Sequence, residues 1–160
     1  MLNCVYDCSY CFLQGMFNSA NYLVFVNYED YFKEIEKIIK TNTNNRICFF
    51  SGYDCDSLAL DYLTNFVTNF VDFFSRYQNA FLEIRTKSVN IKPLFKFKPS
   101  KNIIIAYSIN PQSVIEKFEE KTPNFEKRLN ALKKIQEKGW NIGLRFDPIF
   151  ISKKNKNEYL

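Results

Sequence analysis

Three cysteines lie within eight residues close to the start of the sequence. Cys4, Cys8 and Cys11 have the spacing C-x3-C-x2-C, and the aromatic residue Phe12 follows the last of them. Thiols this close together can bind a metal ion, form a disulfide or hold an iron–sulfur cluster. The chemistry of this stretch depends on which other ligands the chain offers.

The rest of the sequence offers no obvious fourth metal ligand. The chain has no histidine, and a structural zinc site usually takes four Cys or His ligands. Cys48 lies among apolar residues in a strand-like stretch, which predicts a small core residue rather than a ligand. A disulfide would leave an odd thiol. The interpretation that remains is an iron–sulfur cluster held by three thiolates with one iron open, and the alternative is a zinc site or a chance grouping.

Composition favours a single globular domain over residues 1–160. The sequence is 46% hydrophobic and contains 17 Phe and 10 Tyr, which supplies ample apolar area for a core. The net charge of +5 is compatible with an anionic partner, but it also describes an ordinary solvated surface. No run is long enough to span a membrane, and the first residues lack a secretory signal pattern. We therefore expect a cytoplasmic protein without a membrane partner, whose thiols stay reduced.

Helical and strand-like patterns alternate along the chain. Apolar residues recur at helical spacing in three segments, 31–39, 63–74 and 125–135. Short apolar runs of strand length lie between and around them, at 46–50, 80–85, 102–108 and 141–147. This alternation predicts an α/β fold in which helices connect parallel strands.

The last helical segment is flanked by residues that typically begin and end a helix. Thr122 is predicted to cap its N-terminus, Pro123 suits its first position, and Gly139 lies just past its end. Residues 42–45 are predicted to form a turn. Residues 96–101 are predicted to form a loop, part of a basic segment whose lysines and phenylalanines could contact nucleic acid but are better explained as a solvated surface.

Polar residues follow each predicted strand. They are Ser51 and Gly52, Arg85 to Lys87, Ser108 and Asn110, and Arg145 and Asp147. In parallel α/β folds the functional site gathers at the carboxyl ends of the strands, so these positions are candidates. Loop starts in general are also polar, and Asp147 with the proline after it is best explained as a turn that ends a strand.

The cysteine motif, with an aromatic residue after its last cysteine, resembles the signature of the radical S-adenosylmethionine (SAM) enzymes. The resemblance implies a [4Fe-4S] cluster whose open iron binds the amino and carboxylate groups of SAM. An external electron donor, such as flavodoxin or ferredoxin, would then drive cleavage of SAM to a 5′-deoxyadenosyl radical. The implied fold is a partial, open TIM-like βα barrel.

Longer stretches resemble the spore photoproduct lyase family. They include "DCSYCFLQG" at 7–15, "DSLALDYLT" at 56–64, "LEIRTK" at 82–87 and "IGLRFDPIFI" at 142–151, together with the stretch 106–140. The resemblance implies a lyase that uses the SAM radical to repair a methylene-bridged thymine dimer, with DNA as the partner that carries the lesion.

The resemblance also assigns roles to individual residues. The cluster ligands are the three cysteines of the motif, Cys4, Cys8 and Cys11. Cys55, or the neighbouring Asp56, matches the stretch that holds the amino acid moiety of SAM. Lys87 matches a lysine that reaches SAM, and Ser108 matches a serine at the next strand end. An ammonium group suits the SAM carboxylate, and hydroxyls suit its ribose.

Three departures from the family pattern affect these assignments. The lyases have a cysteine that returns a hydrogen atom to the product, whereas this chain has Tyr53 in that register and Cys55 two residues later. Phe12 stands where the lyases have a tyrosine. Few residues precede Cys4, so we expect the radical SAM core domain to be incomplete and truncated at both ends.

Three functions are compatible with these observations. The first is a spore photoproduct lyase-like radical SAM enzyme that acts on a DNA photolesion. The second is a radical SAM enzyme of the same family with a different substrate, for which Phe12 and Tyr53 are the motivation. The third is an iron–sulfur binding module without catalysis.

Overall fold

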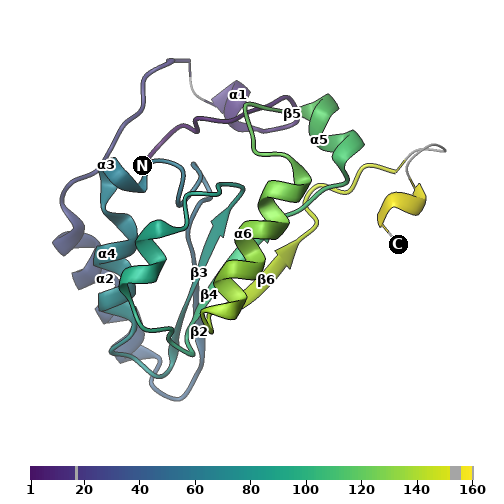
Figure 1. Ribbon diagram of the computed structural model, residues 1–160. Coiled ribbons are helices and arrows are strands. Elements are labelled where there is room, and N and C mark those ends of the chain that lie inside the picture. The colour runs from purple at the N-terminus through teal and green to yellow at the C-terminus, as the bar shows by residue number, and fades with distance from the viewer. Residues whose placement is uncertain (17, 152–155, 160) are drawn as a thin grey trace.

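A parallel sheet forms the centre of the protein in a computed structural model, which describes residues 1–16, 18–151 and 156–159 (Figure 1). Its strands lie in the order β2-β3-β4-β6. They are β2 (Ile47–Phe50), β3 (Ala80–Thr86), β4 (Ile103–Ser108) and β6 (Asn141–Arg145), each parallel to its neighbours. The predicted α/β fold with parallel strands is confirmed, and the sheet is open rather than closed.

Helices precede the first of these strands and connect the later ones, as predicted. The longer ones are α2 (Tyr28–Thr41), α4 (Phe66–Phe74) and α6 (Phe125–Glu137), and the shorter ones are α1 (Leu13–Met16), α3 (Asp61–Thr64), α5 (Gln112–Phe118) and the 3-10 turns η1 (Lys92–Lys96) and η2 (Lys156–Tyr159). No described helix combines the length and the apolar character that crossing a membrane requires.

The hydrophobic core lies between the sheet and a single layer of helices. Leu82, Ile84 and Ile105 point from β3 and β4 into this layer. Phe74 of α4 and Ile135 of α6 close it from the helix side. Because successive side chains of a strand point to opposite faces, the remaining side chains face a side of the sheet that no described helix covers.

Cys48 is exposed, so the prediction that it is a small core residue is wrong. In β2 the side chains of Ile47 and Phe49 pack against the core, whereas Cys48 and Phe50 point to the uncovered face. A continuous apolar run is typical of a strand buried on both faces. Here β2 is an edge strand with one covered face, which the run of apolar residues does not reveal.

The N-terminus of α6 differs from its prediction. The capping residue is Asn124, whose side-chain oxygen accepts a hydrogen bond from the N–H of Lys127 at 3.0 Å. Thr122 and Pro123 both precede this cap. The prediction for Gly139 is confirmed, since it follows the helix with a φ of +97° and its N–H donates to the carbonyl of Gln136 at 2.8 Å.

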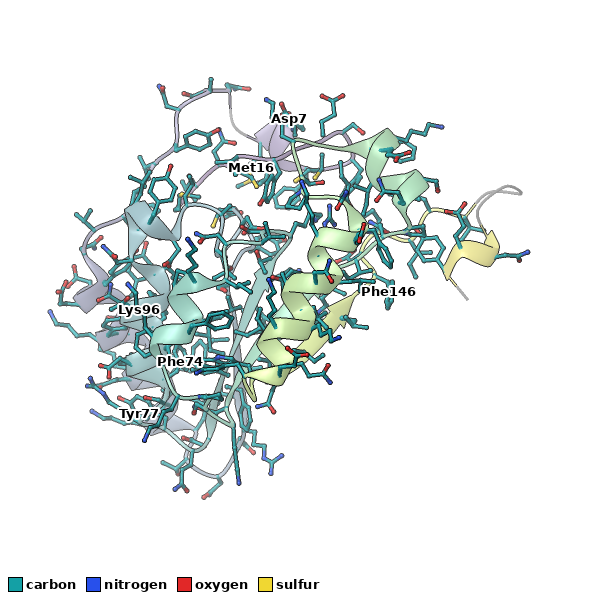
Figure 2. All side chains as sticks on the ribbon, in the orientation of Figure 1. Asp7, Met16, Phe74, Tyr77, Lys96 and Phe146 are labelled. Atoms are coloured by element: carbon teal, nitrogen blue, oxygen red, sulfur yellow. The ribbon has the colours of Figure 1, made fainter. Side chains whose placement is uncertain are left out.

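A second, two-stranded sheet lies beside the carboxyl end of the parallel sheet (Figure 1). Strand β1 (Asp7–Cys8) pairs antiparallel with β5 (Glu119–Glu120), and Cys8 lies opposite Glu119. Asp7 and Met16 lie at this end of the molecule, and Tyr77 lies at the other end (Figure 2). The cysteine stretch is therefore held at the edge where the parallel strands end.

Candidate functional site

One small cavity gathers the residues that the sequence predicted for the site. It has a volume of about 90 Å³ and lies between the cysteine stretch and the carboxyl ends of β3 and β4. The predicted residues that line it are Cys4, Cys8, Cys11, Tyr53, Cys55, Asp56, Lys87 and Ser108. Residues from four separate parts of the chain thus meet at one place, as the strand-end rule for parallel sheets requires.

The cysteine stretch folds back on itself through a short turn. The N–H of Cys11 donates to the carbonyl of Cys8 at 2.9 Å, and the N–H of Gln14 donates to the carbonyl of Cys11 at 3.1 Å. The buried side chain of Leu13 then anchors α1. The turn brings Cys8 and Cys11 to the same side of the stretch, where Cys4 also lines the cavity.

Burial governs the acidity of two of these thiols. It raises the pKa of Cys4, and it raises the pKa of Cys8 to about 11, although the nearby Lys87 ammonium acts in the opposite direction. An unliganded thiol with a raised pKa stays protonated at neutral pH. Binding of a metal centre must therefore displace a proton from these cysteines.

The chemistry of the donor set is that of an iron–sulfur site. Among the residues that the structure describes, no group of three His, Cys, Asp or Glu side chains is arranged to hold a metal ion. Cys4, Cys8 and Cys11 line one shared cavity, and thiolates are the ligands that iron–sulfur clusters take. The donor set therefore fits the cluster.

A buried ion pair fixes the cysteine stretch to the rest of the fold. Arg128 of α6 donates to the carboxylate of Glu119 at 2.5 Å, and both side chains are completely buried. The Tyr10 hydroxyl, which lies between Cys8 and Cys11 in sequence, donates to the same carboxylate at 2.6 Å. Burial acts to raise the pKa of Glu119, but Arg128 and Lys87 outweigh it and hold that pKa below its usual value.

The same arginine also connects to the end of β4. Its Nη1 donates to the carbonyl of Ser108 at 3.0 Å, and its Nε donates to the carbonyl of Pro123 at 2.8 Å. Asn110 completes the network by donating to Glu119 at 2.8 Å. The position of the cysteine turn is thereby set relative to the strand that carries Ser108.

Asp56 has a structural role in this site. Its Oδ1 accepts hydrogen bonds from the N–H groups of Leu58 and Ala59 and from the Thr86 hydroxyl, at 3.0, 2.9 and 2.7 Å. Its Oδ2 accepts from the N–H of Lys87 at 2.6 Å. A buried carboxylate with four donors is well satisfied. Asp56 therefore joins the loop after β2 to the end of β3, and its role in holding SAM stays a prediction.

Lys87 and Ser108 occupy the ends of adjacent strands. The Lys87 side chain is half-buried, and its ammonium lies 5.9 Å from the centroid of the Tyr10 ring. Ser108 is buried at the end of β4. Their proximity to the cysteines agrees with the roles that the resemblance implies, which remain predictions.

Tyr53 and Cys55 lie on the loop after β2 in different surroundings. Tyr53 is 72% exposed, and its ring centroid lies 5.4 Å from that of Phe12. Cys55 is half-buried, and burial raises the pKa of its thiol to about 11. Both residues line the cysteine cavity, so proximity alone does not separate them as hydrogen donors.

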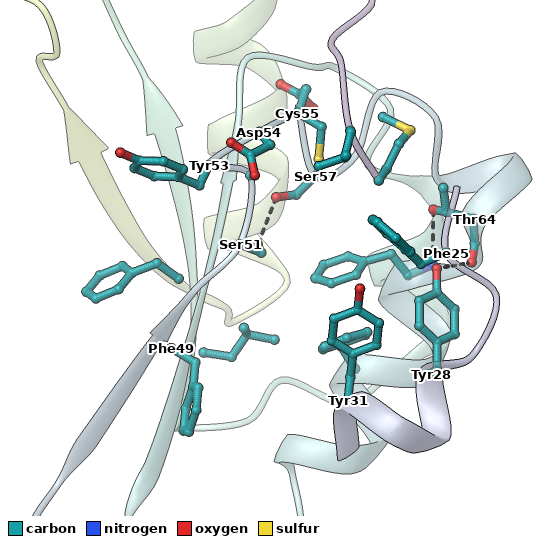
Figure 3. A pocket seen from close by; sticks show the side chains of 18 of the residues that line it. Phe25, Tyr28, Tyr31, Phe49, Ser51, Tyr53, Asp54, Cys55, Ser57 and Thr64 are labelled. Atoms are coloured by element: carbon teal, nitrogen blue, oxygen red, sulfur yellow. Dashed lines mark hydrogen bonds between the residues drawn. The ribbon is translucent and has the colours of Figure 1, made fainter. Parts of the chain in front are cut away.

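A larger cavity adjoins the site on the other side of this loop. Its volume is about 530 Å³, and aromatic residues from α2, α4 and β2 line much of it, together with the loop after β2. Tyr28 closes one wall, where its hydroxyl donates to the carbonyl of Thr64 at 2.7 Å (Figure 3). Cys55 and Tyr53 both line the two cavities, and the Tyr53 ring points away from Phe25 and Tyr28 (Figure 3).

Sequence reasoning missed the residues that support the site. Tyr10, Glu119 and Arg128 were not singled out, because their partners lie up to 109 residues away in the chain. It also gave no role to Glu83, which receives hydrogen bonds from two arginines. A charged residue inside an apolar strand run was the signal that could have drawn attention to Glu83.

Comparison with known proteins identifies similar sequences. A family model described as "Spore photoproduct lyase" matches residues 1–160. The spore photoproduct lyase of Geobacillus sp. (strain Y412MC61) is 28% identical over 148 residues, which is 92% of this chain and 43% of the relative. The spore photoproduct lyase of Bacillus subtilis (strain 168) is 28% identical over 149 residues, which is 92% of this chain and 44% of the relative.

Solved structures give the same result for the fold. A spore photoproduct lyase complexed with dinucleoside spore photoproduct superposes with a TM-score of 0.92 at 27% identity, over 99% of this chain and 47% of the other. A mutant with bound AdoMet and dinucleoside spore photoproduct gives a TM-score of 0.91, also at 27% identity, with the same coverage. The chain thus spans less than half the length of these relatives, and its fold is the partial TIM-like barrel that the resemblance implied.

Proposed function

Since this chain belongs to the spore photoproduct lyase family, we propose that it is the cluster-holding and SAM-binding part of a radical SAM lyase. Residues 1–160 would form one radical SAM core domain, which is incomplete relative to its longer relatives. The observation that carries the proposal is the shared cavity in which three cysteines meet Lys87 and Ser108 at the strand ends.

In the proposed mechanism the three cysteines of the motif hold the cluster. Cys4, Cys8 and Cys11 lose their protons as they bind it, against the burial that raises the pKa of Cys4 and Cys8. A bound [4Fe-4S] cluster supplies the electron that cleaves SAM to methionine and a 5′-deoxyadenosyl radical. An external donor such as flavodoxin or ferredoxin would provide that electron.

The protein's own contribution is to bind, orient and shield SAM. The Lys87 ammonium would pair with the SAM carboxylate, and the Ser108 hydroxyl would contact its ribose. Cys55 and the backbone around Asp56 would hold the amino acid moiety. The four hydrogen bonds to the Asp56 carboxylate hold this loop against the end of β3.

The proposed substrate is a DNA photolesion, the methylene-bridged thymine dimer of spore DNA. Solved relatives bind dinucleoside spore photoproduct, which supports this choice. The lesion must leave the base stack to reach a radical formed at a cavity on the protein. Cys55 or Tyr53 would return a hydrogen atom to the product. A DNA substrate and reduced thiols would both be consistent with a cytoplasmic location.

Anaerobic reconstitution tests the proposal. The full-length protein is reconstituted with iron and sulfide and then incubated with dithionite, SAM and dinucleoside spore photoproduct. We expect 5′-deoxyadenosine and repaired thymine in wild type. The Cys8→Ala variant should lose most of its iron and all SAM cleavage, whereas Cys48→Ala, which changes an exposed thiol on β2, should keep both.

Two outcomes would replace this proposal by another. SAM cleavage without thymine formation would favour a radical SAM enzyme with a different substrate, for which Phe12 beside Tyr53 is the supporting observation. A cluster that forms but leaves SAM intact would favour a non-catalytic iron–sulfur module. Colourless protein with tightly bound zinc would exclude all three functions.

A further inference from the structure

We propose that Arg85 and Arg145 bind the phosphodiester of a nucleic acid substrate on the face of the sheet that no described helix covers. The inference rests on the proposed function and adds to it a specific contact for the strand that carries the lesion. It is argued from the arrangement of both arginines around Glu83.

Glu83 lies between the two arginines and is bound by both. Arg85 donates to its Oε1 from Nε and Nη2, each at 3.3 Å. Arg145, which ends β6 two strands away, donates to Oε1 from Nε at 3.0 Å and to Oε2 from Nη2. A single carboxylate thus orients two guanidinium groups from different strands.

Arginines outnumber the carboxylate in this group. Two guanidiniums and the Glu83 carboxylate sum to +1, and the Asp147 carboxylate also interacts with Arg145 through its charge. The Glu83 side chain is 9% exposed, while those of Arg85 and Arg145 are 28% and 39% exposed. The two guanidiniums, rather than the Glu83 carboxylate, therefore face the solvent, where an anionic ligand can approach them.

Both arginines retain hydrogen-bond donors. Each uses Nε and Nη2 for Glu83, and no hydrogen bond of either Nη1 is recorded among the described residues. A guanidinium carries five N–H groups in a planar fork that matches phosphate oxygens. Since Glu83 already fixes the orientation of both side chains, little side-chain entropy would be lost on binding a phosphate.

Exposed aromatic rings accompany the arginines. The Arg145 guanidinium lies 6.0 Å from the centroid of the Phe50 ring, which is 58% exposed on the same uncovered face. Arg85 also lines the cysteine cavity together with Tyr53. Positive charge for the backbone with aromatic rings for the bases is the combination that single-stranded nucleic acid binding uses.

The position of Arg85, Glu83 and Arg145 relative to the proposed site favours a contact with substrate over a purely structural ion pair. Arg85 is two residues from Lys87, and both line the cavity of the cysteines. A structural ion pair needs only one arginine for Glu83. A second arginine at a half-exposed position adds charge but contributes little to the hydrophobic core. A phosphodiester held here would keep its flanking bases near the cavity.

Two probes that are similar in shape but differ in charge test the inference. Binding of thymidylyl-thymidine is compared with that of its neutral methylphosphonate analogue, by calorimetry on the cluster-loaded full-length protein at low salt. We expect wild type to bind the charged dinucleotide about tenfold more tightly. In Arg145→Gln this preference should fall to about twofold or less, and Arg145→Lys should retain part of it because it keeps the charge but not the fork.

Arg76→Gln is the control, because Arg76 is an exposed arginine paired with Asp72 on α4, away from the cavity. It should keep the full preference. Equal binding of both probes by wild type, or no binding of either, would overturn the inference, as would an unchanged preference in a folded Arg145→Gln. Repair of dinucleoside spore photoproduct, which lacks the phosphate, tests the proposed function separately in wild type.

Discussion

At the scale of single residues, the site depends on a few positions where backbone segments meet closely. The loop after β2 runs along the end of β3, and Ser57 N–H donates to the carbonyl of Arg85 at 3.2 Å. Gly52 makes this approach possible, since it adopts a φ of +73° and its Cα faces the carbonyl of Arg85. Asp56 then fixes the loop from the other side. Small and acidic residues thus decide where Cys55 lies.

Gly52→Ala should destabilise the protein by about 1–3 kcal/mol. The positive φ strains any residue with a Cβ, and an added Cβ would lie 2.8 Å from the carbonyl oxygen of Arg85 and 2.7 Å from the Ser57 hydroxyl. Urea unfolding followed by circular dichroism measures the loss. The control is Gly15→Ala, where an added Cβ meets nothing within 4 Å. Equal midpoints for wild type and Gly52→Ala would contradict this account.

At the scale of elements, polar side chains determine where helices begin. Asn124 caps α6 in the usual way, by accepting from the N–H three residues later. Asp61 does so from further away, since it is buried and its Oδ1 accepts the N–H of Val67 in α4 at 2.7 Å. Burial raises the pKa of Asp61, with the Val67 N–H and Lys96 acting in the opposite direction.

Asp61→Asn should change the pH dependence of stability. A carboxyl with a raised folded pKa favours the protonated state, so wild type should gain stability as pH falls through that folded pKa towards the unfolded value near 4. The asparagine keeps the acceptor for Val67 and has no charge to bury. Its free energy of unfolding should equal or exceed that of wild type at pH 7 and should lack the gain at low pH.

Denaturant midpoints between pH 3 and pH 7 measure this effect. Asp61→Ala is the control, because it removes both the charge and the cap and should lose about 1 kcal/mol at pH 7. A profile for Asp61→Asn that runs parallel to that of wild type would show that Asp61 is not the titrating group.

At the scale of the whole molecule, helices cover one face of the sheet, and both of its edge strands lack a further partner strand among the described residues. Among the described residues, β2 pairs only with β3, and β6 pairs only with β4. Edge strands with free backbone groups can pair with other chains. Leu144 of β6 is 51% exposed and adds apolar surface to such an edge.

Leu144→Lys should reduce self-association of the 160-residue chain. A lysine on an edge strand disfavours pairing with a second strand, because its charge would be buried. Size-exclusion chromatography with light scattering, over a tenfold concentration range, should show larger species for wild type than for the variant. The control is Leu129→Lys, which places the same charge at an exposed position on α6. Monomeric wild type at every concentration would refute the expectation.

The sequence by itself determined the order of the main elements and singled out the three cysteines as candidate ligands. Alternating periodicities predicted α2, α4 and α6 and the four parallel strands to within a few residues, because local spacing decides which face of an element is apolar. The spacing of Cys4, Cys8 and Cys11 restricted the kinds of metal site that the sequence could predict, since few metal sites are built from three thiolates without histidine. Short elements such as α5 and β5 were missed because they are too short to show a period.

Only the tertiary structure decided which side chains meet and which faces stay open. The exposure of Cys48 follows from the position of β2 at the sheet edge, and the contact of Tyr10 with Glu119 joins segments 109 residues apart. Likewise, Glu83 and Arg145 pair across 62 residues. Periodicity records only neighbours within a few residues, whereas burial, ion pairing and cavity formation depend on how distant segments pack. For that reason the sequence could predict the cysteines as ligands but not the network that holds them in place.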